Sequence, residues 1–246
     1  MEDITIIINS YKPKKKELFR SIKSCLDQIM VNVTIIVSTI ENDPTISFLE
    51  ELNNPKINLV ISLKTEHPGI GSKGIYYQLN KALKIVKTDY VSYLSSNDRM
   101  LKTKSINEIN KIKKENTICC FSLYNILYTK KNYILKKTKF NIEKKDITFE
   151  YLLKRNYIND CATINLKRLK IPLPLQFNYK KYENFCYWNL WLTLAHKYGI
   201  GCISFNDRVE WEYIRDIDNS QSLNKSKDKI KYENNLKKMI TNEYSI

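Results

Sequence analysis

The chain has 246 residues, enough for one large α/β domain or two small ones, and its 43% apolar residues exclude a disordered protein. The formal net charge is +15, carried mainly by lysines spread along the whole chain. Such a charge attracts polyanions, nucleotide phosphates or an acidic membrane face without choosing among them. An AT-rich genome alone would also give this lysine content, so the charge identifies no partner.

The six cysteines show neither a Cys-x-x-Cys pair nor the dense spacing of a small disulfide-stabilised protein. Most lie inside apolar runs, so we expect reduced core thiols. No charged-then-apolar leader precedes the first apolar run, and no apolar stretch approaches the roughly 20 residues of a membrane span. We therefore expect a soluble, cytoplasmic protein with at most a peripheral contact at the cytoplasmic face of a membrane.

The first half alternates strand and helix patterns, as a parallel sheet with crossover helices requires. The expected strands are residues 3–9, 33–38, 57–63 and 89–94. The expected helices are residues 14–30, 45–53 and 73–86. In such a Rossmann-like sheet a ligand binds beyond the carboxyl ends of the strands, and polar residues do follow the strands there, at 9–11, 38–43 and 95–99.

The second half has a different pattern. We expect, in order, a hairpin of residues 117–128 and 132–136, a short helix at 147–155, a strand at 161–166, a helix at 182–198 and an extended segment at 203–214. No repeat or flexible linker interrupts the chain. The economical prediction is a single domain over 1–220, with a nucleotide-binding half (1–100) and an acceptor half (101–220), followed by a charged helix or tail at 221–246.

Residues 73–98 read KGIYYQLNKALKIVKTDYVSYLSSND. This block resembles the helix, strand and acidic loop of the inverting family 2 glycosyltransferases, in a subgroup that reads roughly KGIYDAMNKGIKLATGDYIGFLNSDD. Two further segments resemble the same family. They are the opening strand with its turn and helix, ITIIINSYKPKKKELFRSIKSCLDQ, and the WNLWLTLA helix of residues 188–195. Together the three segments cover most of residues 3–215.

The resemblance implies a GT-A fold, with a mostly parallel sheet flanked by helices. It also implies a hexosyl- or N-acetylhexosaminyltransferase that moves a sugar from a nucleotide sugar, with UDP the expected nucleotide, to a hydroxyl of a glycan, glycolipid or protein-linked acceptor. The transfer would invert the configuration at the anomeric carbon of the sugar and would serve polysaccharide biosynthesis.

The acidic loop would hold a divalent cation, Mn²⁺ or Mg²⁺, that neutralises the charge of the departing diphosphate. Family members carry an Asp-X-Asp-type loop, where this chain has Ser95, Ser96, Asn97 and Asp98. The metal ligands are then Asp98 and the amide oxygen of Asn97, since Mg²⁺ often uses one or two carboxylates plus substrate phosphates. A plain turn is the alternative, because Ser, Asn and Asp all favour turns.

The position of the catalytic base departs most from the family pattern. An inverting transfer needs a carboxylate to accept the acceptor's hydroxyl proton, and the family helix places one where this chain has Cys186 and Tyr187. The nearest carboxylate is Glu183, one helical turn upstream, which we predict as the base. Alternatively, Glu183 is a solvated carboxylate near a helix N-terminus.

The resemblance also implies the nucleotide-sugar contacts. Asn9, Ser10 and Tyr11 follow the first strand, and Thr39 and Glu41 follow the second. The second group has an alternative role, because Asp43 and Thr45 could instead make this loop a helix N-terminus. Diphosphate contacts are predicted for Lys73, Arg99, Asn97, Asp98 and Arg215, and Gly74 is a further predicted nucleotide-sugar contact.

Two other functional classes compete with the transferase. The altered loop and the displaced base motivate a catalytically degenerate relative that binds nucleotide sugar or a partner protein without turnover. The charge motivates a nucleic-acid-binding module, but the sequence has no helix-turn-helix, zinc-knuckle or RNP-like signature, so we expect no nucleic-acid partner.

Overall fold

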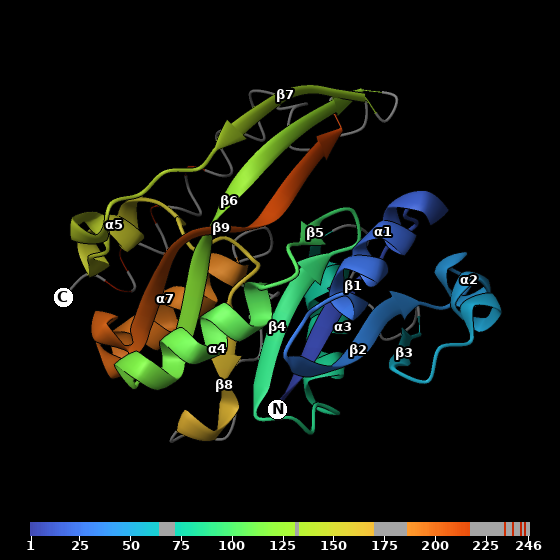
Figure 1. Cartoon of the computed structure of the whole chain (residues 1–246), viewed down its shortest axis with the longest axis horizontal. Coiled ribbons are helices and arrows are strands. Elements are labelled where there is room, and N and C mark those ends of the chain that lie inside the picture. Colours follow the sequence, from blue (N-terminus) through green and yellow to red (C-terminus); the bar gives the residue numbers. More distant parts are fainter. Residues whose placement is uncertain are drawn as a thin grey trace.

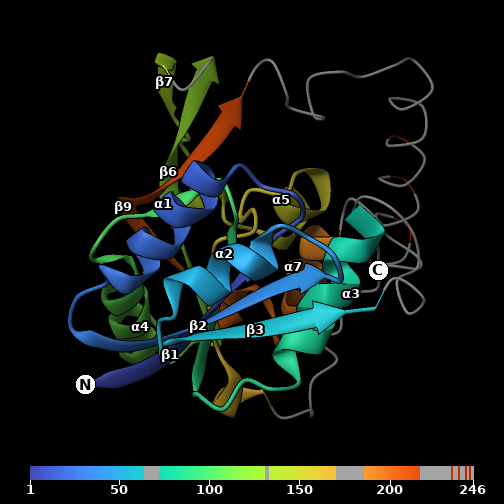
Figure 2. The ribbon, with the colours of Figure 1, turned by 90° about the vertical axis from the view of Figure 1, so that its right-hand side faces the viewer.

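The computed structural model describes residues 1–63, 72–130, 133–169 and 186–216, together with Asn234, Lys238, Asn242 and Tyr244. Its nine strands form one mixed sheet with the order β3-β2-β1-β4-β8-β6-β9-β5, and β7 pairs with β6 (Figure 1). Helices α1 and α4 cover one face of the sheet, and α3 and α7 cover the other (Figure 2). The predicted α/β architecture with flanking helices is confirmed.

The first half of the sheet is parallel and closely follows the sequence prediction. Its strands are β1 (Glu2–Asn9), β2 (Val31–Ile40), β3 (Ile57–Ser62) and β4 (Tyr90–Ser95). Its helices are α1 (Lys15–Leu26), α2 (Thr45–Leu52) and α3 (Ser72–Leu83). The central strand β1 is apolar on both faces, with Ile4, Ile6, Ile7 and Ile8 wholly buried, as expected of a parallel strand covered by helices on both sides.

The second half is built around two long strands, β6 (Cys119–Lys130) and β9 (Ile203–Asp216), which pair in parallel. The remaining strands are β5 (Arg99–Met100), β7 (Tyr133–Lys139) and β8 (Thr163–Asn165), and the helices are α4 (Lys104–Glu115), α5 (Phe149–Lys154) and α7 (Cys186–Tyr198). Short 3₁₀ turns cover Lys144–Asp146, Leu166–Arg168 and Ile200–Cys202. The predicted hairpin is confirmed as β6 and β7.

Helix α1 is shorter than expected. The predicted helix of residues 14–30 ends at Leu26, because Met30 takes a left-handed conformation (φ 59°) and the chain turns into β2. Ile29, which the periodicity placed on the buried face, is 44% exposed. The five cysteines with described side chains are free and buried, as the composition indicated.

Helix α4 was not predicted, because it buries a lysine and a glutamate where a surface helix would bury apolar residues. Lys104 and Glu108 are fully buried and form an ion pair of 2.7 Å. Lys104 also donates to Ser92 on β4 (3.1 Å), and Glu108 accepts from Ser122 on β6 (2.6 Å). Burial lowers the pKa of Lys104, but Cys161 and Glu108 outweigh this and raise it overall. Burial also raises the pKa of Glu108, against the opposing effect of the Lys104 ammonium.

Helix α7 is held in place by contacts with two distant segments. The indole of Trp188 donates to the carbonyl of Leu152 (2.6 Å), and the indole of Trp191 donates to the carbonyl of Asn159 (2.6 Å). Near the end of the chain, the Tyr244 hydroxyl lies 2.8 Å from the Thr193 hydroxyl.

Among the described residues, no helix is both long and apolar enough to cross a membrane.

Candidate active site

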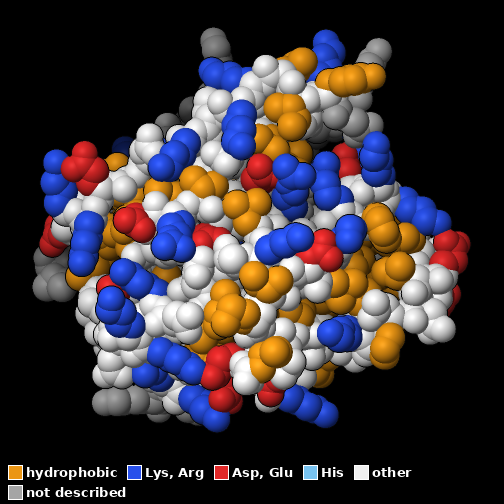
Figure 3. Space-filling view, viewed as in Figure 1, with side chains coloured by type: hydrophobic (Ala, Val, Ile, Leu, Met, Phe, Trp, Pro, Cys, Tyr) orange, Lys and Arg blue, Asp and Glu red, His pale blue; other side chains and the backbone are white. Residues whose placement is uncertain are grey.

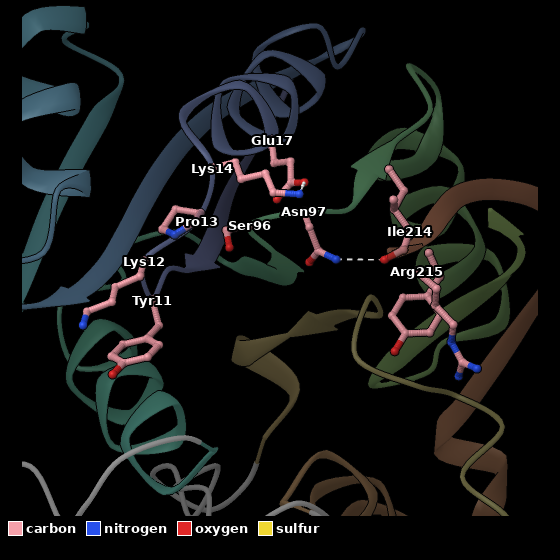
Figure 4. A pocket seen from close by; sticks show the side chains of 10 residues that line it. Tyr11, Lys12, Pro13, Lys14, Glu17, Ser96, Asn97, Ile214 and Arg215 are labelled. Carbon is pink, nitrogen blue, oxygen red and sulfur yellow. Dashed lines mark hydrogen bonds and ion pairs between the residues drawn. The ribbon is translucent and has the colours of Figure 1, made fainter. Parts of the chain in front are cut away.

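An open pocket of about 480 Å³ lies at the carboxyl ends of β1 and β4 (Figure 4). Three segments line it: the loop from β1 into α1, the turn after β4, and the end of β9. The lining residues are Tyr11, Lys12, Pro13, Lys14, Glu17, Ser96, Asn97, Tyr213, Ile214 and Arg215. This is the edge of the sheet where the strand pattern predicted a ligand site.

The first wall is a loop held by a buried carboxylate. Lys12 has a positive φ of 46°, and its backbone N–H donates to Asp43 Oδ2 (2.7 Å). Asp43 Oδ1 accepts from the backbone N–H of Thr45 (2.8 Å), at the start of α2. Asp43 therefore ties the loop to α2, and Tyr11 and Lys12 of this loop line the pocket (Figure 4).

The second wall is the turn of Ser95–Asp98, which joins β4 to β5. The backbone N–H of Asp98 donates to the carbonyl of Ser95 (3.0 Å), and Ser21 on α1 donates to the carbonyl of Asp98 (2.5 Å). The Asn97 amide donates to the carbonyl of Ile214 (2.8 Å), and Arg20 donates to the carbonyl of Asn97 (2.8 Å). The predicted turn is thus fixed on both sides, by α1 and by β9.

The carboxylate of Asp98 lies beneath this turn and is fully buried. Its Oδ1 accepts from the backbone N–H of Ile214 (2.8 Å), whereas its Oδ2 is buried and has no hydrogen-bond partner. Burial raises the pKa of Asp98 well above its ordinary value, and the neighbouring Asp160 raises it further. An unpaired buried oxygen of this kind is costly unless a proton or a cation occupies it.

Asp160 is the functional candidate that the sequence prediction missed. It precedes β8, which pairs antiparallel with β4 through Ser92 and Thr163. Extending that register places Asp160 opposite Ser95, and the Ser95 hydroxyl indeed donates to Asp160 Oδ2 (3.0 Å). Asp160 Oδ1 is buried without a hydrogen-bond partner. A carboxylate three residues before a strand that pairs with β4 was the available signal, but it required the pairing to be known.

The predicted nucleotide contacts separate into groups. Tyr11, Asn97 and Arg215 line the pocket. Ser10 is fully buried, and its hydroxyl lies 2.8 Å from that of Thr45, so it belongs to the packing between β1 and α2. Asn9 Oδ1 is buried at the end of β1 without a hydrogen-bond partner.

The predicted contacts after the second strand, Thr39 and Glu41, do not line the pocket. Thr39 is fully buried and its hydroxyl has no hydrogen-bond partner, while Glu41 is half-buried and donates its backbone N–H to Ser62 (3.0 Å). Asp43 and Thr45 make this loop the start of α2, which was the alternative interpretation. Lys73 and Gly74 lie in the first turn of α3, but the surroundings of these two residues are outside the described part.

The third wall is the end of β9. The Arg215 guanidinium lies 5.0 Å from the ring centre of Tyr213, and its buried Nε has no hydrogen-bond partner. Arg99 on β5 forms an ion pair with Glu212 instead of entering the pocket. Arg215 is therefore the cation that β9 offers to a ligand.

The predicted base, Glu183, lies outside the described residues. At the position where the family helix carries a carboxylate, Tyr187 packs its ring against Tyr93 of β4, with 5.7 Å between ring centres. Tyr187 therefore fills this place with an aromatic contact.

A divalent cation would find two carboxylates here. Among the described residues, no group of three or more His, Cys, Asp or Glu side chains is placed to hold a metal ion. Asp98 Oδ2 and Asp160 Oδ1 are nevertheless both buried and unpaired at the end of β4. This donor set fits a hard cation that takes one or two carboxylates and completes its shell with phosphate and water.

No family model matches the sequence. Among curated proteins, the chain is 29% identical over 238 residues to WfaP of Escherichia coli, a UDP-Glc:alpha-D-GlcNAc-diphosphoundecaprenol beta-1,3-glucosyltransferase, covering 96% of this chain and 86% of WfaP. Among solved structures, it is similar to residues 1–349 of S. aureus TarS in complexes with UDP (TM-score 0.58) and with UDP-GlcNAc (TM-score 0.59), each at 15% identity. The chain is therefore similar to glycosyltransferases of the GT-A type.

In both TarS comparisons the alignment covers 97% of this chain but only 65% of the TarS chain. At 15% identity the likeness to TarS shows the shared fold. The fold predicted from the block at residues 73–98 is therefore confirmed, whereas the individual site residues stay predictions.

Proposed function

We propose that the protein transfers a hexose or N-acetylhexosamine from a UDP-sugar to a hydroxyl of a lipid-linked or glycan acceptor, with inversion. WfaP, whose name specifies UDP-glucose and a diphosphoundecaprenol acceptor, supports the donor and the acceptor class. The TarS complexes with UDP and UDP-GlcNAc support the donor. The reaction would take place at the cytoplasmic face of a membrane, in polysaccharide synthesis.

The observation that carries the proposal is the pocket beyond β1 and β4. It has cationic side chains on two walls, Lys12 and Lys14 on one and Arg215 on another. Cations around an open pocket suit a diphosphate, whose oxygens accept charge-assisted hydrogen bonds. The unpaired carboxylates of Asp98 and Asp160 lie behind the turn that forms this wall.

We assign the cation to these two carboxylates, with Asn97 as a further oxygen donor. The bound cation would supply neutralisation of the charge that develops on the departing diphosphate. Lys14 and Arg215 would hold the diphosphate from the other walls. The Tyr11 ring would contact the nucleotide.

The transfer also needs a proton acceptor. A carboxylate takes the acceptor's hydroxyl proton, the freed oxygen bonds to the anomeric carbon, and the bond from that carbon to the diphosphate breaks, so that UDP leaves with the electron pair. Glu183 remains the predicted base. The ring contact of Tyr187 with Tyr93 supports a carboxylate from outside the usual helix position.

The test is UDP release from UDP-glucose and UDP-GlcNAc in the presence of Mn²⁺ or Mg²⁺ and a diphospholipid-linked GlcNAc acceptor. The Asp98→Asn, Asp160→Asn and Glu183→Gln variants are compared with Asp207→Asn, an exposed carboxylate on β9. We expect the first three to lose release and Asp207→Asn to keep it.

UDP binding by calorimetry separates the transferase from a degenerate relative. UDP binding in the wild type without release from any donor and acceptor pair would favour the non-catalytic alternative. Loss of release in Asp207→Asn as well would indicate a general defect and remove the assignment of Asp98 and Asp160.

A further inference from the structure

We infer that the β6–β7 hairpin is a docking surface for an anionic phospholipid membrane. The hairpin projects from the body of the molecule (Figure 1). Its second strand, β7, exposes three consecutive large apolar side chains, with Tyr133 76%, Ile134 59% and Leu135 58% exposed. Consecutive exposed apolar residues mark an interaction surface rather than ordinary surface scatter.

A local irregularity presents these side chains in different directions. The register of β6 with β7 shifts between Tyr128 and Thr129, which pair with Lys136 and Ile134, so Leu135 is the extra residue of a bulge. A bulge twists the strand and re-aims its side chains. The three apolar side chains therefore do not form one flat face. Such a group inserts into the headgroup region of a membrane more readily than it packs against a flat protein surface.

Positive charge surrounds these three side chains. Residues 119–142 contain no aspartate or glutamate. The described lysines of the hairpin are all exposed, and they are Lys130, Lys136, Lys137 and Lys139. Among these described lysines, only Lys137 has a carboxylate near it, Glu212 at 3.9 Å. Figure 3 shows orange and blue side chains side by side on this projecting part, at the top of the view. Apolar side chains ringed by lysines complement anionic headgroups above acyl chains.

Two other occupants fit less well. A second copy pairing along the β7 edge would set lysines opposite lysines, and like charges directly opposite one another destabilise a sheet. An anionic glycan would bind the lysines but leave the three apolar side chains exposed. An anionic membrane would contact both the lysines and the apolar side chains.

The hairpin also lies beside the pocket. In the parallel pairing of β6 with β9, Tyr128 lies opposite Arg215, which lines the pocket. Ile134 lines a small crevice of about 100 Å³ together with Arg20 and Arg99. Docking would therefore bring the pocket next to the headgroup layer, where the diphosphate of a lipid-linked acceptor lies. This purpose rests on the proposed function, whereas the docking itself does not.

The test is flotation with vesicles of phosphatidylcholine alone or with about 30% phosphatidylglycerol, whose charge the lysines would recognise. We expect the wild type to bind the anionic vesicles only. Replacing Lys136, Lys137 and Lys139 by Gln should weaken binding on the order of 100-fold, because each lysine near such a surface contributes about fivefold. The matched control replaces Lys84, Lys87 and Lys114, three exposed lysines outside the hairpin, and should retain binding within a few-fold.

Insertion is measured with a Tyr133→Trp variant. We expect a blue-shifted indole emission and quenching by brominated lipids, whereas Ile85→Trp, a reporter at another exposed apolar position, should not change. Equal losses in both lysine variants, no vesicle binding by the wild type, or no shift in Tyr133→Trp would each overturn the inference. A hairpin-dependent dimer in analytical ultracentrifugation would replace it with self-association. None of these measurements requires transferase activity, so failure here and failure of the proposed function are distinguishable.

Discussion

Two groups of charged side chains lie close to β4, and they differ in one respect. Lys104 and Glu108, together with Ser92 and Ser122, form a network in which both charged side chains have partners. Asp98 is also buried and Asp160 is half-buried, but each keeps one buried oxygen without a hydrogen-bond partner. A satisfied network stabilises the fold by itself, whereas an unsatisfied one costs free energy until a ligand completes it. The comparison separates charges that stabilise the fold from charges that we propose to serve the reaction.

The largest effect should come from breaking the satisfied pair. Glu108→Gln leaves the Lys104 ammonium buried without its counter-charge, and removing one partner of a buried pair typically costs about 3–5 kcal/mol. We expect the free energy of unfolding, measured by urea denaturation, to fall by that amount. A loss under about 1 kcal/mol would mean that water or a neighbour replaces the carboxylate.

Next in size is the effect of Asp98→Asn on transfer. We expect the rate of UDP release to fall by about 10²–10³-fold, the usual cost of losing one electrostatic contribution to a transition state. The free energy of unfolding should not fall, since the variant removes an uncompensated buried carboxylate. Loss of folding instead of activity would place Asp98 with the structural charges.

The pH dependence of stability without metal is a smaller effect. Burial raises the pKa of Asp98, so the folded state keeps this proton at pH values at which the unfolded chain has released it. The contribution is therefore full below the ordinary Asp pKa of about 3.9. It is lost as the pH rises toward the raised pKa, by about 1.4 kcal/mol for each pH unit between the two pKa values. We expect Asp98→Asn to flatten this decline in thermal unfolding between acidic and neutral pH. A decline identical to that of the wild type would assign it to another group.

The smallest effect should come from an exposed pair. Lys15 and Glu51 lie 2.6 Å apart, but both side chains are 64% exposed. Exposed pairs contribute about 0–1 kcal/mol, so Lys15→Gln should shift the unfolding midpoint barely and lose even that shift at high salt. This variant gives the change in stability for an ordinary exposed ion pair, with which the changes at the two buried groups can be compared.

The sequence predicted those regions in which the buried residues are the ones that form a periodic apolar pattern. The four parallel strands and the β6–β7 hairpin lie where period and turn residues indicated, because apolar side chains there form the core. Helix α4 was missed because its buried face carries Lys104 and Glu108, whose burial depends on partners from β4, β6 and β8. The turn of Ser95–Asp98 was found from local residues. Asp160 was not, since its place in the site depends on strand pairing.

Tyr244 has a consequence for any shortened form of the protein. Its hydroxyl bonds to Asn189 and Thr193, and its ring lies 5.6 Å from that of His196, so three positions of α7 contact this one side chain. A truncation that removes Tyr244 would therefore remove a buried side chain that holds α7 in place. A shortened form made for expression should retain this tyrosine.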